Sequence, residues 1–427
     1  MLDINYIREN LDAVKANCEN RNVTADVDEV IRLDDDRKRI TAEAQVLQQR
    51  ANEVSKKVKQ AKSKEERDPL IQEGRELRDQ ITQIEEKRKE VEDQRDAVIF
   101  TIPNMTHPDA PVGKQDTDNK VIKTWGEPTK FDFEPKDHIA LAEALDLVDF
   151  ESGSSVVGQK FYYLKNEAAL LEIALIQYAM QHLVSKGYTP IITPDMAKVD
   201  VLEGVGYIPR GPETQIYSIA NTDLCLIATA EITLGGMHRD KILDMSQLPQ
   251  RYVGLSHCFR TEAGAPGRDA RGLYRVHQFT KVEMFAFCTP ETSEDLHLEL
   301  LAIEEEIFQG LGLAYHVIDT CTGDLGGPAY RKYDLEAWMP GRGDAGEYGE
   351  VTSTSNCTDF QARRLNIKYR APDKKKAQFV HTLNGTAVAI TRAILAILEN
   401  YQQADGTVKI PEALQKWVGK ETIEPKK

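Results

Sequence analysis

The feature that most constrains the fold is the stretch of residues 28–100, which is dense in charge and almost free of glycine and proline. Its apolar residues fall at steps of three, four or seven: Leu33, Ile40, Ala44, Leu47, Ala51, Val54 and Val58, then Leu70, Leu77, Ile81, Ile84, Val91 and Val98. Gly74, Arg88 and Arg95 occupy slots where apolar residues are expected. This spacing is typical of a coiled coil. We predict two antiparallel helices of about 33 residues and about 50 Å each, joined by a turn at residues 62–69.

Basic residues gather at the tip of this predicted hairpin: Lys56, Lys57, Lys59, Lys62, Lys64 and Arg67, against Glu65 and Glu66. The whole chain carries a net charge of −15, which argues against indiscriminate nucleic-acid binding. Any RNA contact must therefore come from a local basic patch such as this one. The alternative is a solvated helical tip without a partner.

Composition bounds the remaining architecture. With 427 residues and 41% hydrophobic content, the chain can bury a sizeable core and is expected to hold two domains. Prolines at 103, 108, 111 and 128 predict a linker over 101–130 between an N-terminal domain, 1–100, and a larger domain, 131–427. The six cysteines form no C-x-x-C pair, so we expect reduced thiols without a zinc cluster. The sequence shows no signal pattern and no long apolar run, which predicts a soluble cytoplasmic protein without a membrane segment.

A β-hairpin is predicted from residues 251–259 and 275–285, which have strand composition and flank a polar loop with Arg260, Arg268, Arg271 and Arg275. Alternation places His277, Phe279, Lys281, Glu283 and Phe285 on one face of the returning strand. Phe279 and Glu283 then stand about 13 Å apart. This span suits an elongated ligand with a flat aromatic group at one end and a cation or hydroxyl at the other, and Arg260 could hold a phosphate between them. An exposed hairpin with solvated charges is the alternative.

The order of residues in this hairpin resembles a known motif. Arg-Thr-Glu at 260–262, a Gly/Arg-rich loop and Gly-Leu-x-Arg-x-His-Gln-Phe-x-Lys-x-Glu at 272–283 resemble the second signature motif of class II aminoacyl-tRNA synthetases, in the form of the seryl-tRNA synthetases. The resemblance implies an α+β fold, with an antiparallel β-sheet catalytic domain flanked by helices. It also implies that the helical hairpin grips the long variable arm of a tRNA. The residues implied to bind ATP here are Arg260, on the α-phosphate, Thr261, Glu262, Val276 and Phe279, which stacks on adenine.

Two further segments carry oxygen groups suited to substrate or metal. Thr229-Ala230-Glu231 could hold an ammonium group, or Thr229 and Glu231 could cap a helix. The triplet resembles the family's loop for the substrate serine, which Glu283 also contacts in the family.

Glu350 and Ser353 lie three apart in EVTSTSN, and their hard oxygens suit Mg²⁺, although such a pair is usually structural. By resemblance Glu350 and Ser353 hold the metal on ATP, Val351 and Thr352 belong to the same ATP-binding segment, and Asn356 supports it.

The segment 380–402 is predicted to form a strand, a turn at Asn384-Gly385 and an apolar helix that carries Arg392. Core packing explains the helix but not the arginine. The segment resembles the third class II motif, which implies that Arg392 lies over the adenine and reaches the γ-phosphate, and that Asn384 and Thr386 contact serine. Many members have Asn-Gly-Ser-Gly where this chain has Asn-Gly-Thr-Ala, and Thr386 keeps the hydroxyl.

Residues 161–187 are predicted to form a short strand and a long helix with an apolar face, and an extended segment with Pro190 and Pro194 follows. The long helix that leads into a strand with proline resembles the first motif, which implies a homodimer. Gly341, Gly343 and Gly346 satisfy G-x-G-x-x-G, but strand composition follows them, which excludes a dinucleotide-binding fingerprint.

Together the resemblance implies an enzyme that activates L-serine with ATP and Mg²⁺ to seryl-adenylate and transfers the seryl group to tRNA(Ser), with tRNA(Sec) as a further candidate. Two other classes stay open: an enzyme that loads a carrier protein, and a non-catalytic RNA-binding regulator. The long helical arm disfavours the first, and Arg260, Glu262, Glu283, Glu350 and Arg392 together disfavour the second.

Overall fold

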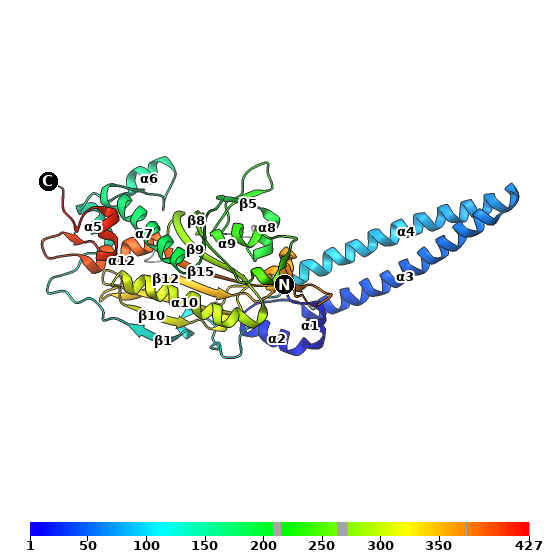
Figure 1. Ribbon diagram of the computed structural model, residues 1–427, viewed down its shortest axis with the longest axis horizontal. Coiled ribbons are helices and arrows are strands. Elements are labelled where there is room, and N and C mark those ends of the chain that lie inside the picture. Colours follow the sequence, from blue (N-terminus) through cyan, green and yellow to red (C-terminus); the bar gives the residue numbers. More distant parts are fainter. Residues whose placement is uncertain (208–214, 263–271, 373, 427) are drawn as a thin grey trace. The chain divides into compact units, whose positions relative to one another are not determined.

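The computed structural model describes residues 1–207, 215–262, 272–372 and 374–426 (Figure 1). It divides into two compact units, residues 1–105 and 106–427. The sequence predicted a linker over 101–130. In the structure the division falls between residues 105 and 106, and a strand within that range, β1 (Lys120–Trp125), joins the sheet of the second unit.

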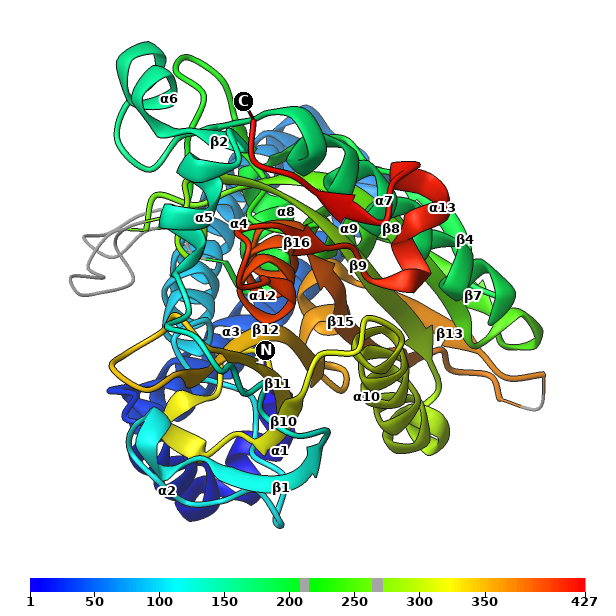
Figure 2. The same cartoon turned by 90° about the vertical axis from the view of Figure 1, so that its left-hand side faces the viewer.

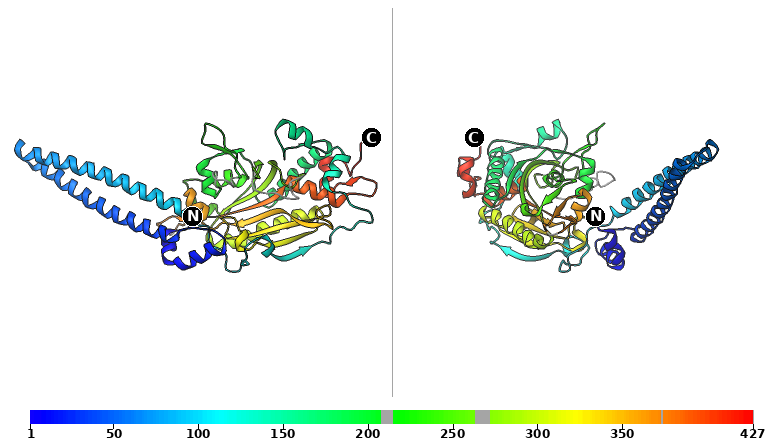
Figure 3. Two further views of the ribbon diagram at one scale, coloured as in Figure 1. Left: turned by 180° about the vertical axis from the view of Figure 1, so that it is seen from behind. Right: turned by 45° about the vertical axis from the view of Figure 1, so that its right-hand side comes forward.

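The first unit is helical and contains α1 (Ile4–Glu9), α2 (Leu11–Asn20), α3 (Val27–Gln60) and α4 (Lys64–Ile99). Helices α3 and α4 run side by side for their whole length (Figure 3). The apolar seam predicted from the sequence supplies their buried contacts, including Leu33, Ile40, Ala44, Val54 and Leu77. The predicted helical hairpin is therefore confirmed, with 34 and 36 residues in its two helices.

The turn at the tip is shorter than the sequence pattern predicted. Ser63 caps α4 by accepting a hydrogen bond from the Glu66 amide at 3.3 Å, and Pro69 lies inside the helix. The proline costs one backbone hydrogen bond there because it has no N–H. The Ser-x-x-Glu pattern of a helix start was the stronger signal, so the prediction of a turn over all of residues 62–69 was wrong.

A buried carboxylate holds the root of the hairpin together. Asp34 is 1% exposed and contacts Arg8 of α1 at 2.8 Å, Arg37 and Lys38 of α3 at 3.0 and 2.8 Å, and Arg95 of α4 at 3.8 Å. Burial alone would raise the pKa of Asp34, but hydrogen bonds from Lys38, Arg8 and Arg37 outweigh it and lower the pKa to about 2.

The second unit is built on one large sheet, which in the described residues has eight strands in the order β1-β10-β11-β12-β15-β9-β8-β4. Neighbouring strands are antiparallel except for β4 and β8. The strands after β1 are β4 (Thr189–Ile192), β8 (Gln250–Phe259), β9 (Gln278–Cys288), β10 (Tyr315–Asp319), β11 (Arg331–Met339), β12 (Glu347–Asn356) and β15 (His381–Ala389). The predicted antiparallel sheet is confirmed, and Figure 2 shows its twist.

Helices cover this sheet and small strand pairs lie around it. The helices are α5 (His138–Ala144), α6 (Phe150–Val156), α7 (Asn166–Ser185), α8 (Val199–Val205), α9 (Ala230–Gly236), α10 (Ser293–Gly310), α11 (Phe360–Leu365), α12 (Ile390–Tyr401) and α13 (Glu412–Val418). The smaller strands are β2 (Val148–Asp149), β3 (Tyr163–Leu164), β5 (Met196–Lys198), β6 (Leu224–Leu226), β7 (Ile242–Asp244), β13 (Lys368–Arg370), β14 (Gln378–Phe379), β16 (Val408–Lys409) and β17 (Thr422–Ile423).

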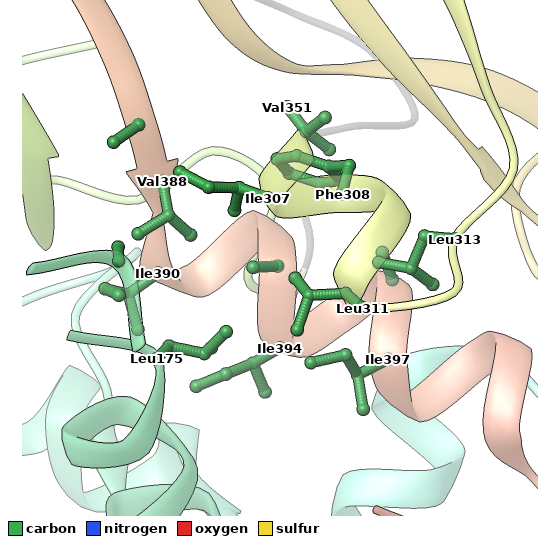
Figure 4. Close-up of a cluster of buried hydrophobic side chains, with 14 of the residues drawn as sticks. Leu175, Ile307, Phe308, Leu311, Leu313, Val351, Val388, Ile390, Ile394 and Ile397 are labelled. Atoms are coloured by element: carbon green, nitrogen blue, oxygen red, sulfur yellow. The ribbon is translucent and has the colours of Figure 1, made fainter. Parts of the chain in front are cut away.

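Strand β9 separates the main core from the face that carries the polar residues. Its even-numbered residues Val282 and Met284 pack into the larger apolar core. That core joins α7, α10 and α12 through Leu175, Ile307, Phe308, Ile394 and Ile397 (Figure 4). Its odd-numbered residues Phe285 and Phe287 pack into a second core with α8, α9 and α11. Alternation along a strand thus leaves the odd positions before Phe285 on the face opposite the main core.

Strand β15 contradicts one prediction, because no turn occurs at Asn384-Gly385. Both residues pair in register with Phe285 and Met284 of β9 and with β12 on the other side. A Cβ on Gly385 would lie 3.0 Å from Glu304 Oε1 and Thr354 Oγ1. The glycine therefore serves close packing in the middle of the sheet rather than a change of chain direction.

Helix α7 has one apolar side in the core and one exposed. By length and composition alone it is apolar enough to cross a membrane, but Leu171, Leu175 and Leu183 pack into the main core. Leu170, Ile173 and Val184 are exposed, and so is Ile192 of the adjacent β4 at 81%.

Candidate active site

The hairpin predicted from the sequence forms the centre of the site. Strands β8 and β9 pair antiparallel, with Cys258 opposite Phe279 and Phe259 opposite Gln278. Arg260 follows directly, and its guanidinium lies over the Phe279 ring at 5.4 Å. The strand pairing thus brings the cation and the aromatic ring together.

A first cavity lies over this hairpin and the neighbouring strands β12 and β15. It is lined by Arg260, Glu262, Tyr274, Val276, Phe279, Lys281, Glu350, Val351, Thr352, Thr386, Ala389, Thr391 and Arg392. The wall therefore combines guanidinium groups with flat aromatic rings, a combination that suits a nucleotide.

A second cavity adjoins the first and is richer in carboxylates. Its lining residues include Tyr207, Glu231, Arg260, Lys281, Glu283, Asp324, Lys332, Glu350, Ser353, Asn384 and Thr386. Arg260, Lys281, Glu350 and Thr386 line both cavities. A molecule in one cavity can therefore reach a molecule in the other across these four side chains.

The floor of the second cavity is a buried triad of polar side chains. Glu283 Oε2 lies 2.5 Å from Lys281 Nζ and accepts a hydrogen bond from Thr386 Oγ1 at 3.3 Å. Lys281 and Glu283 are 7% and 2% exposed. A buried charge is tolerated when it is paired and hydrogen-bonded, so the triad keeps polar groups in place at the cavity surface, as a small hydroxyl ligand would require.

Glu231 forms the opposite wall of this cavity. Its Oε1 accepts hydrogen bonds from Gln361 at 2.7 Å and Asn384 at 2.9 Å. Burial, with a smaller contribution from the Glu283 charge, raises the pKa of Glu231 to about 7. An ammonium group beside Glu231 would favour its ionised form, since the positive charge would offset the burial and the repulsion from Glu283.

Arg392 and Glu350 pair across the first cavity. Their side chains approach to 3.2 Å, and Arg392 also donates to the Glu350 carbonyl at 2.9 Å. The Arg392 guanidinium stacks on the Tyr274 ring at 4.6 Å. Burial disfavours the charge of Glu350, but Arg392 and Lys332 outweigh it, so its pKa lies below the ordinary value.

The residues predicted to hold a metal supply only part of a coordination shell. Glu350 reaches both cavities and Ser353 lines the second. The described residues contain no group of three His, Cys, Asp or Glu side chains that could hold a metal by themselves. Two hard oxygen donors at the edge of these cavities fit Mg²⁺, which usually completes its shell with water and phosphate oxygens.

Some predicted site residues do not line either cavity. Among the described residues these are Thr229, Ala230 and Thr261. Thr229 is the N-cap of α9 and accepts from the Glu231 amide at 3.3 Å, so the capping alternative holds for Thr229. Asn356 turns away and donates to the Ser293 carbonyl at 3.4 Å. Arg268 and Arg271 lie outside the described residues.

The structure adds three side chains that the sequence reasoning did not select. Lys281 could have been found, since it lies on the same strand face as Phe279 and Glu283. Tyr274 precedes the strand, where no periodicity marks it. Gln361 comes from α11, 130 residues from its partner Glu231, and nothing in the sequence connects the two.

The chain is similar to known proteins along nearly its whole length. The family description "Seryl-tRNA synthetase N-terminal domain" matches residues 1–106, and "tRNA synthetase class II core domain (G, H, P, S and T)" matches residues 216–401. The chain is 56% identical to the serine–tRNA ligase of Treponema denticola over 423 residues, 99% of this chain and 100% of the relative.

Solved structures show the same likeness. A crystal structure of seryl-tRNA synthetase from Pyrococcus horikoshii complexed with ATP has a TM-score of 0.90 and 41% identity, and covers 100% of both chains. The cytoplasmic serine–tRNA ligase of Naegleria fowleri in complex with AMP has a TM-score of 0.87 and 34% identity, and covers 100% of this chain and 99% of that chain.

Proposed function

The chain belongs to the seryl-tRNA synthetase family, and we propose that its two adjoining cavities bind ATP and L-serine as partners in one reaction. The enzyme is an ATP-dependent serine–tRNA ligase. The observation that carries the assignment is the shared wall of Arg260, Lys281, Glu350 and Thr386. It lets the carboxylate of an amino acid in one cavity meet the α-phosphate of a nucleotide in the other.

In the ATP cavity, the proposed roles follow charge and shape. Phe279 stacks on adenine, Arg260 holds the α-phosphate, and Arg392 leaves Glu350 to reach the outer phosphates. Glu262, Val276, Val351 and Thr352 complete the wall, and Thr261 orients Arg260 and Glu262 through the backbone. Because the Arg260 guanidinium is already held over the Phe279 ring, it stabilises developing phosphate charge with little reorganisation.

In the serine cavity, Glu231 accepts the ammonium group, with Thr229 and Ala230 placing it at the start of α9. Glu283 and Thr386 bind the side-chain hydroxyl, and Asn384 orients Glu231. Alanine would leave the hydroxyl-binding groups unpaired, which can cost orders of magnitude in discrimination. Threonine is excluded by size.

Glu350 and Ser353 would hold Mg²⁺ against the ATP phosphates, where the bound ion neutralises phosphate charge. In the first step, the serine carboxylate attacks the α-phosphorus, and pyrophosphate leaves as seryl-adenylate forms. In the second, the 3′-hydroxyl of the terminal tRNA adenosine takes the seryl group and AMP leaves. The protein needs no covalent nucleophile, since positioning and charge stabilisation suffice.

The tRNA partner is proposed to be tRNA(Ser), gripped by the α3–α4 hairpin through its exposed basic tip, which reads RNA shape and phosphates. The exposed apolar side chains of α7 and β4 are proposed to form a homodimer interface in the cytoplasm, because such a patch favours a protein partner.

The test is amino-acid-dependent exchange of labelled pyrophosphate into ATP, with twenty amino acids and no tRNA. We expect exchange with serine alone. Exchange with another amino acid would overturn the roles of Glu283 and Thr386, and no exchange with any amino acid would overturn the assignment of both cavities.

A further inference from the structure

A buried histidine–glutamate pair lies behind the ATP cavity, and none of the roles above uses it. His138, the first residue of α5, places Nδ1 2.9 Å from Glu399 Oε1 of α12. The Glu399 side chain is 2% exposed and that of His138 is 11% exposed. Neither residue lines the first or second cavity, so the pair does not contact the proposed substrates there.

The hydrogen bonds of Glu399 define the state of the imidazole. Its Oε1 accepts from the His138 amide at 3.0 Å, and its Oε2 accepts from the Gly341 amide at 2.8 Å. Because a carboxylate only accepts, His138 Nδ1 must carry the proton. Nε2 is then an acceptor, and it receives the Leu273 amide at 3.2 Å. The tautomer of His138 with its proton on Nδ1 is therefore compatible with all of these hydrogen bonds.

The pair therefore ties together two segments, one that carries Tyr274 on the wall of the ATP cavity and one that carries Arg342 beside it. Leu273 immediately precedes Tyr274, and Gly341 immediately precedes Arg342. The Tyr274 ring packs against two guanidinium groups, that of Arg342 at 4.3 Å and that of Arg392 at 4.6 Å. Arg342 and Tyr274 thus each follow a backbone amide that the His138–Glu399 pair fixes.

Close packing restricts these two segments further. Gly272 has φ +74, and a Cβ there would lie 2.0 Å from His138 Nε2. A Cβ on Gly341 would lie 2.9 Å from Glu399 Cδ. Each segment approaches the pair as closely as a glycine allows, so a small displacement of the imidazole would displace the backbone before Tyr274.

We infer that His138 and Glu399 are positioning residues for ATP: they fix the backbone before Tyr274, and the Tyr274 ring holds the Arg392 guanidinium beside the cavity. Arg342, which the pair also fixes, packs on the same ring. The inference rests on the proposed assignment of the first cavity to ATP. Its effect should appear in nucleotide binding and leave serine binding nearly unchanged, because the triad of Lys281, Glu283 and Thr386 has no contact with the pair.

The test uses two variants of the full-length protein, one that replaces Nδ1 of the imidazole and one that replaces Nε2. His138→Asn keeps a donor near Glu399 but is too short to accept from Leu273, whereas His138→Gln extends an acceptor toward Leu273. We expect His138→Asn to raise the KM for ATP about tenfold, the effect of one lost buried hydrogen bond. The KM for serine should change less than about twofold, and His138→Gln should recover most of the loss.

His182→Asn is the matched control, since His182 forms a similar pair with Glu306 at 2.9 Å between α7 and α10. It should leave both KM values unchanged. If His138→Asn does not fold, Glu399→Gln replaces it, because it keeps the side-chain shape and puts an NH₂ group against Gly341 or His138.

The measured quantity is the KM for each substrate in serine-dependent pyrophosphate exchange, with thermal unfolding recorded for each variant. Equal KM values for ATP in the wild type and His138→Asn would overturn the inference. So would equal increases in both KM values without recovery by His138→Gln, which would indicate a purely structural role. Absence of exchange in the wild type would instead overturn the proposed function.

Discussion

The helical arm and the catalytic cavities use charge in opposite ways. At the tip of the arm, Lys59 and Lys62 are exposed to solvent, where a charge is held by no fixed geometry and contributes little by itself. In the cavities, Lys281 and Glu283 are buried against each other, where removal of one partner leaves the other uncompensated. The difference teaches that the arm can recognise a partner by the sum of many replaceable charges, whereas the cavities depend on individual atoms.

The largest effect is expected when one member of the buried pair of Lys281 and Glu283 is removed. Glu283→Ala should lower serine-dependent pyrophosphate exchange about a thousandfold, because it removes the hydroxyl acceptor and leaves Lys281 unpaired. The control is Glu65→Ala at the tip of the arm, which should exchange normally. tRNA binding by Glu283→Ala, measured by filter retention, should stay normal. Exchange at the wild-type rate would remove Glu283 from the serine site.

Removing the arm should separate the two regions. Deletion of residues 36–94 with a short turn in their place should leave pyrophosphate exchange within about twofold and lower tRNA charging more than about a hundredfold, because the phosphate contacts are lost. A short turn can join residues 35 and 95, since α3 and α4 are neighbours there and the side chains of Asp34 and Arg95 meet at 3.8 Å. Normal charging by the shortened protein would show that the arm plays no part in tRNA recognition.

The pH dependence of serine use tests the cavity side of the comparison. The pKa of Glu231 is raised to about 7, and only the ionised carboxylate pairs with an ammonium group. The kcat/KM for serine should therefore fall about tenfold per pH unit below that value in the free enzyme. The same measurement on Glu231→Gln should show low activity without this acid limb. A wild-type profile that is flat between pH 5.5 and pH 8 would contradict the role.

At the root of the arm, as in the cavities, the loss of one buried charge should have a large effect, in contrast to the exposed tip. Asp34 has its pKa lowered to about 2, so its contribution to stability is present above its unfolded value of 3.8 and is lost as the pH falls toward 2. Asp34→Asn should destabilise the arm by about 2 kcal/mol at pH 7. Amide hydrogen exchange along the first turns of α3 would measure it. Asp28→Asn, at an exposed pair with Lys15, is the control and should change little.

The smallest effect is expected at the tip itself. Lys59→Ala should weaken tRNA binding about twofold and lower the salt dependence by less than one counterion. Lys409→Ala, an exposed lysine of the catalytic unit, should change neither. A loss of more than about tenfold for Lys59→Ala alone would mean that the tip contains a position-specific contact and would end the contrast drawn above.

Periodic features were predictable from the sequence, and features that depend on packing were not. The seam of α3 and α4 and the face of β9 follow from steps of three, four and two, so Leu33, Phe279 and Glu283 lie where periodicity placed them. The turn expected at Asn384-Gly385 was wrong because those residue types also occur where a strand packs tightly against a helix, here against Glu304 of α10. No local pattern distinguishes the two cases.

The candidate site divides in the same way. Arg260, Glu350 and Arg392 could be selected because a short run of residues around each resembles a family motif. Gln361 and the His138–Glu399 pair could not, because the contacts that define their roles join residues far apart in the sequence, 130 positions for Gln361 and Glu231 and 261 for the pair. Such contacts follow from the order of strands in the sheet, which the sequence alone does not specify.

The four side chains shared by the cavities restrict how the enzyme could acquire another amino-acid substrate. A substitution at Arg260, Lys281, Glu350 or Thr386 alters both cavities. Under the proposed assignment, a change that favours a new amino acid would therefore also change the site of the nucleotide. A change of substrate preference would have to begin at residues that line the second cavity alone, such as Glu231, Glu283 and Asn384. Few positions can therefore change the specificity without changing the first cavity, and redesign libraries should vary these residues of the second cavity.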